Sequence, residues 1–312
     1  MSVGGSTKAV VAALVANAAI AVAKFAAFLV TGSSSMLAES IHSVADSGNQ
    51  GLLLWGGKAA KRAPDPEHQF GYGRERYFWS FVVALVLFTL GSGFAIYEGV
   101  EKIRRPHEIS NVAVALGVLG FAIVAEAFSF RTAIKAANPL RGDASWWQFI
   151  RRSRTPELPV VLLEDFGAQV GLIFAFVAVL IAHFAEAPVW DGIGTLAIGI
   201  LLFFIAVLLI VEMRSLLIGE GSDPNEMHTI TSTITGSPSV KRLIHLKTQY
   251  LGPDQLLVAA KIEFADGLSI QELAAAIDQL EHEIRAAVPH ARPTYLEPDL
   301  YRAGYNAPPT DH

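Results

Sequence analysis

The sequence predicts a membrane α-helical protein with six transmembrane helices, followed by a C-terminal cytoplasmic α+β domain. Only 17% of the 312 residues are charged, against about 25% in an average soluble protein. The mean hydropathy is +0.40. The apolar residues are gathered in long runs, and the composition becomes mixed after Met213. We therefore expect a transmembrane domain over residues 1–217 and a cytoplasmic domain over residues 218–312.

The composition also excludes several classes of function. The chain has no cysteine, which rules out disulfide scaffolds, cysteine-ligated metal centres and thiol catalysis. The formal net charge is −5, so no basic excess points to nucleic acid as a partner.

Five apolar runs approach or exceed the roughly 20 residues that cross a ~30 Å hydrocarbon layer. They cover residues 9–30, 78–96, 112–130, 158–182 and 193–211. The first run is too long for a signal peptide core and lacks a clear cleavage site, so we expect it to be retained as a helix. A sixth segment, residues 35–55, has a suitable length but contains Glu39, His42, Asp46, Asn49 and Gln50. We interpret it as a polar-striped transmembrane helix, with a re-entrant or surface helix as the alternative.

The orientation follows from lysine and arginine, which accumulate in cytoplasmic loops. The loop after the second span contains Lys58, Lys61, Arg62, Arg74 and Arg76. The loop after the fourth span contains Lys135, Arg141, Arg151, Arg152 and Arg154. Six spans then place both termini in the cytoplasm. We expect a multi-pass protein of a bacterial inner membrane, because little sequence precedes the first span.

The C-terminal part shows alternating helix and strand signals. Residues 224–235 predict a helix, 240–250 and 256–264 two strands, 270–288 an amphipathic helix, and 292–296 a third strand. Ser269 is a plausible N-cap and Pro289 ends the long helix. The order α-β-β-α-β predicts a small α+β domain.

Ionisable residues inside the apolar spans are the strongest functional signal. These are Lys24, Glu39, His42, Asp46, Glu126, Glu164 and Asp165. A charged residue at the centre of a membrane helix opposes insertion by about 2.5–3.5 kcal/mol. Such side chains should therefore pair with each other, line water or bind a cation.

The spacing of these residues suggests a metal site. His42 and Asp46 are four residues apart and share a helical face, which Asn49 extends by a turn, and Asp165 and Gln169 share a face in the fifth span. Packing the second span against the fifth places His42, Asp46 and Asp165 around one point, with Glu164 as a further candidate. Imidazole and carboxylate suit Zn²⁺, Mn²⁺, Co²⁺ or Fe²⁺. These ligands bind metal only when deprotonated, so metal and protons compete for the site.

Several residues allow two interpretations. Lys24 suits a structural counter-charge to Glu39 or Glu126 better than a ligand. Glu126 is either a proton site or a helix-packing group. Asp65 and His68 form either a metal site in the loop after the second span or a solvated turn next to two prolines.

Three stretches resemble signatures of a known family. They are GSSSMLAESIHSVAD at residues 32–46, HQFGYGRER at 68–76 and WDGIGT at 190–195. Together with the six spans and the C-terminal domain, they resemble the cation diffusion facilitators. The run at 74–79 and YLEPD at 295–299 resemble the branch that contains a mitochondrial zinc transporter and its bacterial relatives.

The resemblance implies a homodimer whose cytoplasmic domains have a metallochaperone-like fold. It implies export of a divalent cation by alternating access, driven by inward proton flow. It assigns His42, Asp46 and Asp165 as metal ligands. The metal, Zn²⁺ before any other, is the transported ion, and no cofactor is implied.

The chain departs from the family pattern in two places. The family usually has a histidine four residues before the aspartate of the fifth span, where this chain has Val161. The missing ligand would be replaced by Glu164, Glu157 or water, which favours Mn²⁺ or Fe²⁺ more than usual. In the C-terminal domain, His245 is near a place where relatives have metal ligands, but two further histidines are lacking. We expect that domain to dimerise and to bind metal weakly or not at all.

Two rival functions belong to other classes. A metal-dependent intramembrane hydrolase would use the same ion to activate water, and a metal sensor would bind without transport. The sequence has no His-Glu-x-x-His, no Gly-x-Ser-x-Gly and no P-loop, so we do not expect an enzyme.

Overall fold

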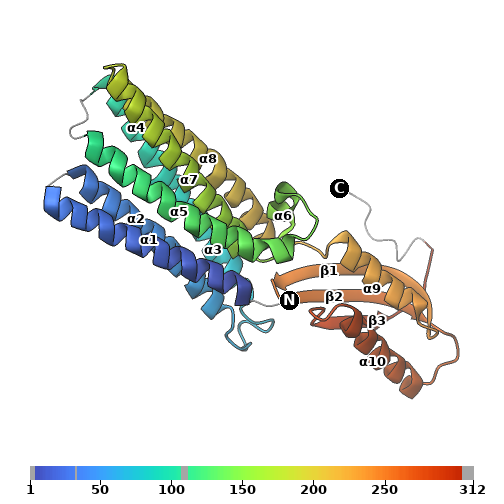
Figure 1. The fold of residues 1–312 in the computed structure, drawn as a ribbon. Helices are drawn as coiled ribbons and strands as arrows, with labels where there is room; N and C mark the ends of the chain where they lie inside the picture. The colour runs from blue at the N-terminus through green and yellow to red at the C-terminus, as the bar shows by residue number, and fades with distance from the viewer. Residues whose placement is uncertain (1–3, 32–33, 107–111, 304–312) are drawn as a thin grey trace. The chain divides into compact units, whose positions relative to one another are not determined.

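The computed structural model describes residues 4–31, 34–106 and 112–303 (Figure 1). Within the first two helices some side chains lie outside this description, among them those of Lys24, Glu39 and His42. Residue contacts divide the chain into two compact units. The first unit comprises Met1–Arg62 and Glu75–Arg214, and the second comprises Ala63–Arg74 and Ser215–His312.

The first unit is a bundle of long helices that run side by side (Figure 1). The long elements are α1 (Gly4–Thr31), α2 (Ser34–Ala59), α5 (Val112–Arg141), α7 (Glu157–Phe184) and α8 (Val189–Ile218), together with a helix built from three segments. Those segments are α3 (Glu75–Val86), the π-helical η1 (Leu87–Gly93) and α4 (Phe94–Arg104). α1 packs against α2 and α5, and α5 packs against α7.

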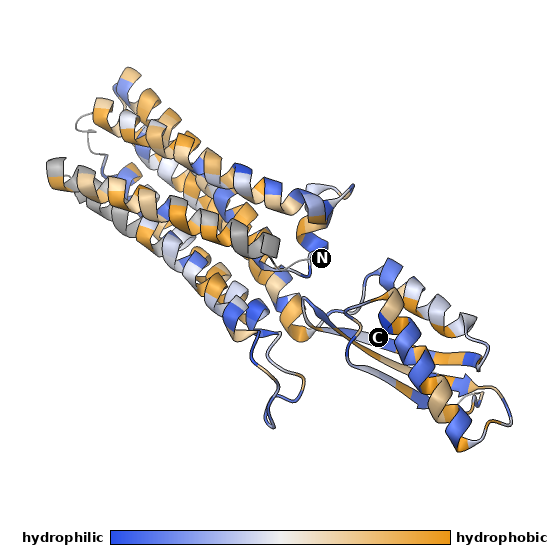
Figure 2. Cartoon of the chain, turned by 60° about the horizontal axis from the view of Figure 1, so that its bottom comes forward, coloured by the Kyte–Doolittle hydropathy of each residue, from blue (hydrophilic) through white to orange (hydrophobic). Residues whose placement is uncertain are grey.

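Four of the described helices are long and apolar enough to cross a membrane. They are Glu75–Arg104, Val112–Arg141, Glu157–Phe184 and Val189–Ile218. Each of these helices contains one of the apolar runs predicted from the sequence and extends beyond it at one or both ends. The runs could be located because hydropathy is a local property of the sequence. Figure 2 shows apolar residues along these helices.

Two features of the bundle were not expected. The third apolar run is not one regular α-helix, because η1 interrupts it with a π-helical segment, a geometry that often marks functional positions. A short helix, α6 (Trp146–Arg152), lies between α5 and α7. The side chain of Ser145 accepts a hydrogen bond from the backbone of Gln148, and the Gln148 side chain accepts one from the backbone of Ser145. This capping box begins α6.

The second unit has the predicted order α-β-β-α-β. It contains α9 (Pro224–Gly236), β1 (Val240–Gly252), β2 (Gln255–Phe264), α10 (Ile270–Ala287) and β3 (Thr294–Pro298). The sheet order is β1-β2-β3. β1 and β2 pair antiparallel with Tyr250 opposite Leu256, and β2 and β3 pair parallel with Ala260 opposite Leu296. Ser269 caps α10 as expected.

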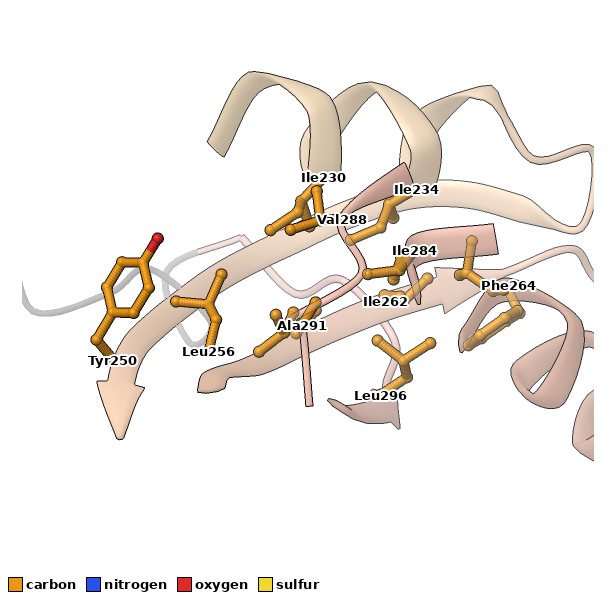
Figure 3. Close-up of a cluster of buried hydrophobic side chains, with 13 residues drawn as sticks. Ile230, Ile234, Tyr250, Leu256, Ile262, Phe264, Ile284, Val288, Ala291 and Leu296 are labelled. Atoms are coloured by element: carbon orange, nitrogen blue, oxygen red, sulfur yellow. The ribbon is translucent and has the colours of Figure 1, made fainter. Parts of the chain in front are cut away.

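The core of the second unit lies between the sheet and its two helices (Figure 3). Ile230 and Ile234 of α9 and Ile284 of α10 are fully buried against the sheet. Leu256 and Ile262 of β2 fill the same core. One face of the sheet is therefore covered, which matches the alternation of buried and partly buried residues along most of β2.

Candidate metal-binding site

A cavity of about 180 Å³ lies inside the first unit. Its wall includes residues of α1, α2, η1, α5, α7 and α8. The apolar part includes Leu87 and Gly91 of η1. The polar part of the lining consists of Asn17, Ser43, Asp46, Asn49, Glu126, Glu164 and Asp165. Four carboxylates from three helices thus face one cavity among membrane helices.

Glu164 is the point at which α2 and α7 meet. Its Oε1 accepts a hydrogen bond from Asn49 Nδ2 at 2.8 Å, and its Oε2 accepts one from Gln50 Nε2 at 3.0 Å. All three residues are buried. The two amide donors fix the orientation of this carboxyl group between α2 and α7.

Asp165 connects α7 to α5. Its Oδ2 accepts a hydrogen bond from Ser129 Oγ at 3.0 Å, and the residue is 1% exposed. Glu164 and Asp165 are consecutive and point about 100° apart around the helix. Both nevertheless line the cavity, because it extends around that face of α7.

Asp46 and Glu126 complete the acidic lining. Both lie near enough to Glu164 to repel its charge. Such a concentration of carboxylates favours a bound cation or bound protons. Among the side chains that the structure describes, no three from His, Asp and Glu converge closely enough to hold one ion. The predicted ligand His42 and the auxiliary Glu39 lie outside the described side chains.

The position of the missing family histidine is occupied by buried Val161. Glu157, one of its possible replacements, is engaged elsewhere in a buried ion pair with Arg76. Glu164, another of the possible replacements, lines the cavity beside Asp165. Gln169, the other predicted auxiliary residue on α7, is not part of the cavity lining, and its Oε1 is buried without a hydrogen-bond partner in the described part of the chain.

The loop residues Asp65 and His68 belong to the second unit. Asp65 Oδ1 accepts hydrogen bonds from the backbone of His68 at 2.7 Å and of Glu67 at 3.0 Å. The Tyr72 hydroxyl donates to Oδ2. This bond and the backbone bonds lower the pKa of Asp65 to about 2. The carboxylate thus organises a turn, and the His68 ring lies 3.4 Å from it.

Sequence reasoning missed one residue of the cavity wall and one buried residue of the bundle outside it. Asn17 of α1 lines the cavity, and its Nδ2 donates to Gln50 Oε1 at 3.4 Å. A lone amide in an apolar run was the signal that could have identified it. Arg76 was counted only as a loop charge, although a buried arginine at a helix start needs an acidic partner.

Comparison with known proteins assigns this chain to a family. Residues 10–218 match the cation efflux transmembrane domain, and residues 222–295 match the cytoplasmic domain of cation efflux proteins. The human mitochondrial proton-coupled zinc antiporter SLC30A9 is 32% identical over 265 residues, which is 83% of this chain and 46% of the antiporter. The chain thus spans about half the length of the first curated relatives that it matches.

Further relatives come from plants and bacteria. Metal tolerance protein C4 of Arabidopsis thaliana is 32% identical over 270 residues, covering 85% of this chain and 59% of the plant protein. Magnetosome protein MamB of Magnetospirillum gryphiswaldense is 24% identical over 269 residues, covering 85% and 84%. These matches confirm the resemblance inferred from the sequence motifs. The chain belongs to the cation efflux family of multi-pass integral membrane proteins, whose members are transporters and not enzymes.

Proposed function

We propose that this protein exports a divalent metal ion, Zn²⁺ first, in exchange for protons by alternating access. The observation that supports the proposal best is the contact of α2 with α7 at Glu164, beside Asp46 and Asp165 in one buried cavity. Binding of a dication neutralises the clustered carboxylates, which otherwise repel each other. The intramembrane hydrolase is not retained, because the family consists of transporters.

Proton coupling follows from the same residues. Carboxylates and imidazole bind metal only in the deprotonated form, so a metal that enters displaces protons. When the metal leaves, protons restore the balance of charge in the cavity. The name of the human relative, a proton-coupled zinc antiporter, supports this exchange.

The ligand set that we propose is His42, Asp46 and Asp165 with Glu164 as the fourth member. Glu126, Asn49, Gln169 and Glu39 remain candidates for proton transfer or support, and Asp65 with His68 remains a candidate loop site. Replacing the usual second histidine by a carboxylate makes the site harder, so Mn²⁺ or Fe²⁺ is the second candidate cargo. Competition among the three ions for transport decides between these cargoes.

The architecture that we propose has six membrane spans, α1 and α2 included, with both termini in the cytoplasm. The protein acts as a homodimer through its second unit, and we place it in a bacterial inner membrane. Crosslinking in membranes tests the dimer, and a result of monomers only would refute it.

Metal flux into proteoliposomes with an imposed pH gradient tests the function. We expect Zn²⁺ flux that follows the gradient and that is abolished in Asp46→Ala and in Asp165→Ala. The control is Asp143→Ala, which removes an exposed carboxylate of the first unit outside the cavity. Its flux should equal that of the wild type.

Binding measurements on the same variants separate transport from sensing. Wild-type protein that binds Zn²⁺ but shows no flux under any gradient would support the metal sensor. Flux that persists in both aspartate variants would refute the proposed site.

A further inference from the structure

The short helix α6 connects two long apolar helices of the bundle. It lies in the segment between α5, which ends at Arg141, and α7, which begins at Glu157. Both neighbours are long and apolar enough to cross a membrane, and they pack against each other. Their adjacent ends fix both ends of residues 142–156 at one membrane surface. α6 is too short to leave that surface, so its exposed side chains meet the layer of lipid headgroups.

The exposed side chains of α6 are aromatic. Trp146 and Trp147 are 40% and 56% exposed, whereas Phe149 of the same helix is 6% exposed and anchors it to the protein. Tryptophan concentrates at the boundary between hydrocarbon and water, because its ring is apolar and its N–H is polar. Two adjacent exposed tryptophans at the end of a membrane span fit that boundary.

Each tryptophan is paired with an arginine. The guanidinium of Arg141 lies 4.7 Å from the ring centre of Trp146, and that of Arg151 lies 5.8 Å from the ring centre of Trp147. Arg151 also forms an ion pair with Glu212 of α8 at 3.1 Å, which attaches α6 to the bundle. These cation–π contacts keep each guanidinium next to a tryptophan ring, so the positive charges and the aromatic rings lie close together.

The segment is also strongly basic in an acidic chain. Residues 141–156 contain four arginines and one acidic residue, although the whole chain has a net charge of −5. Glu212 is near both Arg151 and Arg154. Arg152 is exposed and forms no ion pair with any residue that the structure describes. The charge is therefore concentrated where phosphate groups of lipids lie, and arginine suits phosphate because its planar fork donates two parallel hydrogen bonds.

We propose that α6 is an interfacial helix that binds the phosphate groups of acidic phospholipids. Trp146 and Trp147 insert at the level of the headgroups. Arg152 contacts the lipid phosphates with its exposed guanidinium, and Arg141 does so with Nη2, since its Nε and Nη1 already donate to Asn138 Oδ1 and Ala144 O. The acidic surface of a membrane attracts such basic segments. This site is independent of the metal cavity and does not rest on the proposed transport function.

Fluorescence quenching tests where α6 lies. The full chain is reconstituted in vesicles of brominated phosphatidylglycerol or brominated phosphatidylcholine. The protein has five tryptophans, so the difference between wild type and Trp146→Phe/Trp147→Phe isolates the emission of α6. We expect that share to be quenched, and more strongly in phosphatidylglycerol. No quenching of that share, or equal quenching by both lipids, would overturn the proposal.

Native mass spectrometry of the purified full chain tests the arginines. Each basic residue near an acidic surface contributes about fivefold to affinity. We expect Arg152→Gln and Arg141→Gln each to weaken phosphatidylglycerol binding by about fivefold, with phosphatidylcholine binding unchanged. The matched control is Arg105→Gln, an exposed arginine just after α4 with no aromatic ring contact in the described structure. An equal loss in the control would show general charge attraction only and would overturn the proposed site. No loss in the α6 variants would also overturn it.

Discussion

Arg76 and Glu157 form a buried ion pair that joins the first turn of α3 to the first turn of α7. Arg76 Nη2 donates to Glu157 Oε2 at 2.8 Å, and a second bond runs from Nε to Oε1. The two side chains are 6% and 5% exposed. The pair fixes the relative position of two membrane helices at one end, while Glu164 meets α2 two turns further along α7.

Removing one partner of this pair should destabilise the protein. We expect Glu157→Gln to lower the free energy of unfolding by about 3–5 kcal/mol, because it removes the charge that faces a buried guanidinium at close range. The double variant Arg76→Leu/Glu157→Leu should recover most of that loss. Unfolding in mixed micelles, followed by tryptophan fluorescence, measures all three proteins.

The control for this prediction is an exposed pair at the end of α4. Arg105 and Glu101 form an ion pair with side chains 77% and 43% exposed. Water screens this pair, so Glu101→Gln should cost less than about 1 kcal/mol. Equal losses in Glu101→Gln and Glu157→Gln would contradict the distinction between buried and exposed pairs.

Gln50 should affect metal binding without touching the metal. Its Nε2 holds one oxygen of Glu164, and residues that orient a metal ligand typically contribute 10- to 100-fold to affinity. We expect Gln50→Leu to weaken Zn²⁺ binding within about that range, as measured by isothermal titration calorimetry. Gln279→Leu is the control, since this exposed glutamine of α10 lies in the second unit and does not line the cavity. A loss of the same size in that control would refute the role of Gln50 in positioning Glu164.

Close packing of α4 against α8 should depend on Gly99. A Cβ at this position would lie 2.6 Å from the backbone nitrogen and 2.8 Å from the Cα of Leu196. Backbone atoms cannot move aside, so the helices must separate, and we expect Gly99→Ala to cost about 1–3 kcal/mol. Gly120→Ala in α5 provides the comparison, because a Cβ there meets no atom within 4 Å. That variant should be neutral or slightly stabilising when thermal unfolding is measured in detergent.

Glu226 should make the stability of the second unit depend on pH. Burial raises the pKa of this carboxyl, but hydrogen bonds from His290 and Tyr250 outweigh burial, and the pKa lies below its usual value. The Nε2 of His290 lies 2.9 Å from Oε1, and the Tyr250 hydroxyl donates to Oε2 at 2.7 Å. A lowered pKa means that the folded state favours the ionised form, so the stabilisation is complete above the unfolded pKa and disappears as the pH falls through the folded value.

The measurement compares wild type with Glu226→Gln. At pH 7 we expect the variant to be less stable by about 1–2 kcal/mol, a value reduced because the carboxyl is only half-buried. The difference should shrink as the pH falls below about 4.5. Thermal unfolding of the full chain, followed by circular dichroism, gives both values. A difference that grows in acid would contradict this assignment.

Much of the fold could be predicted because its signals are local. Hydropathy runs place α5, α7 and α8, and short apolar segments bounded by turn residues place β1 and β2. The same reasoning located Asp46, Glu164 and Asp165, since a carboxylate inside an apolar run is costly wherever its partner lies. Local patterns did not reveal η1, because a π-helical segment has the same apolar composition as the helix around it.

The sequence by itself determined the membrane class, the second unit and the acidic residues of the cavity, because period, hydropathy and charge are properties of neighbouring residues. Only the tertiary structure decided which partners these residues have. It paired Glu157 with Arg76 and left Glu164 to Asn49 and Gln50, over separations of 81, 115 and 114 residues. It also placed the loop Ala63–Arg74 in the second unit. These contacts depend on how whole helices and strands pack. The local spacing of residues does not determine which side chains meet when they are about a hundred positions apart in the sequence.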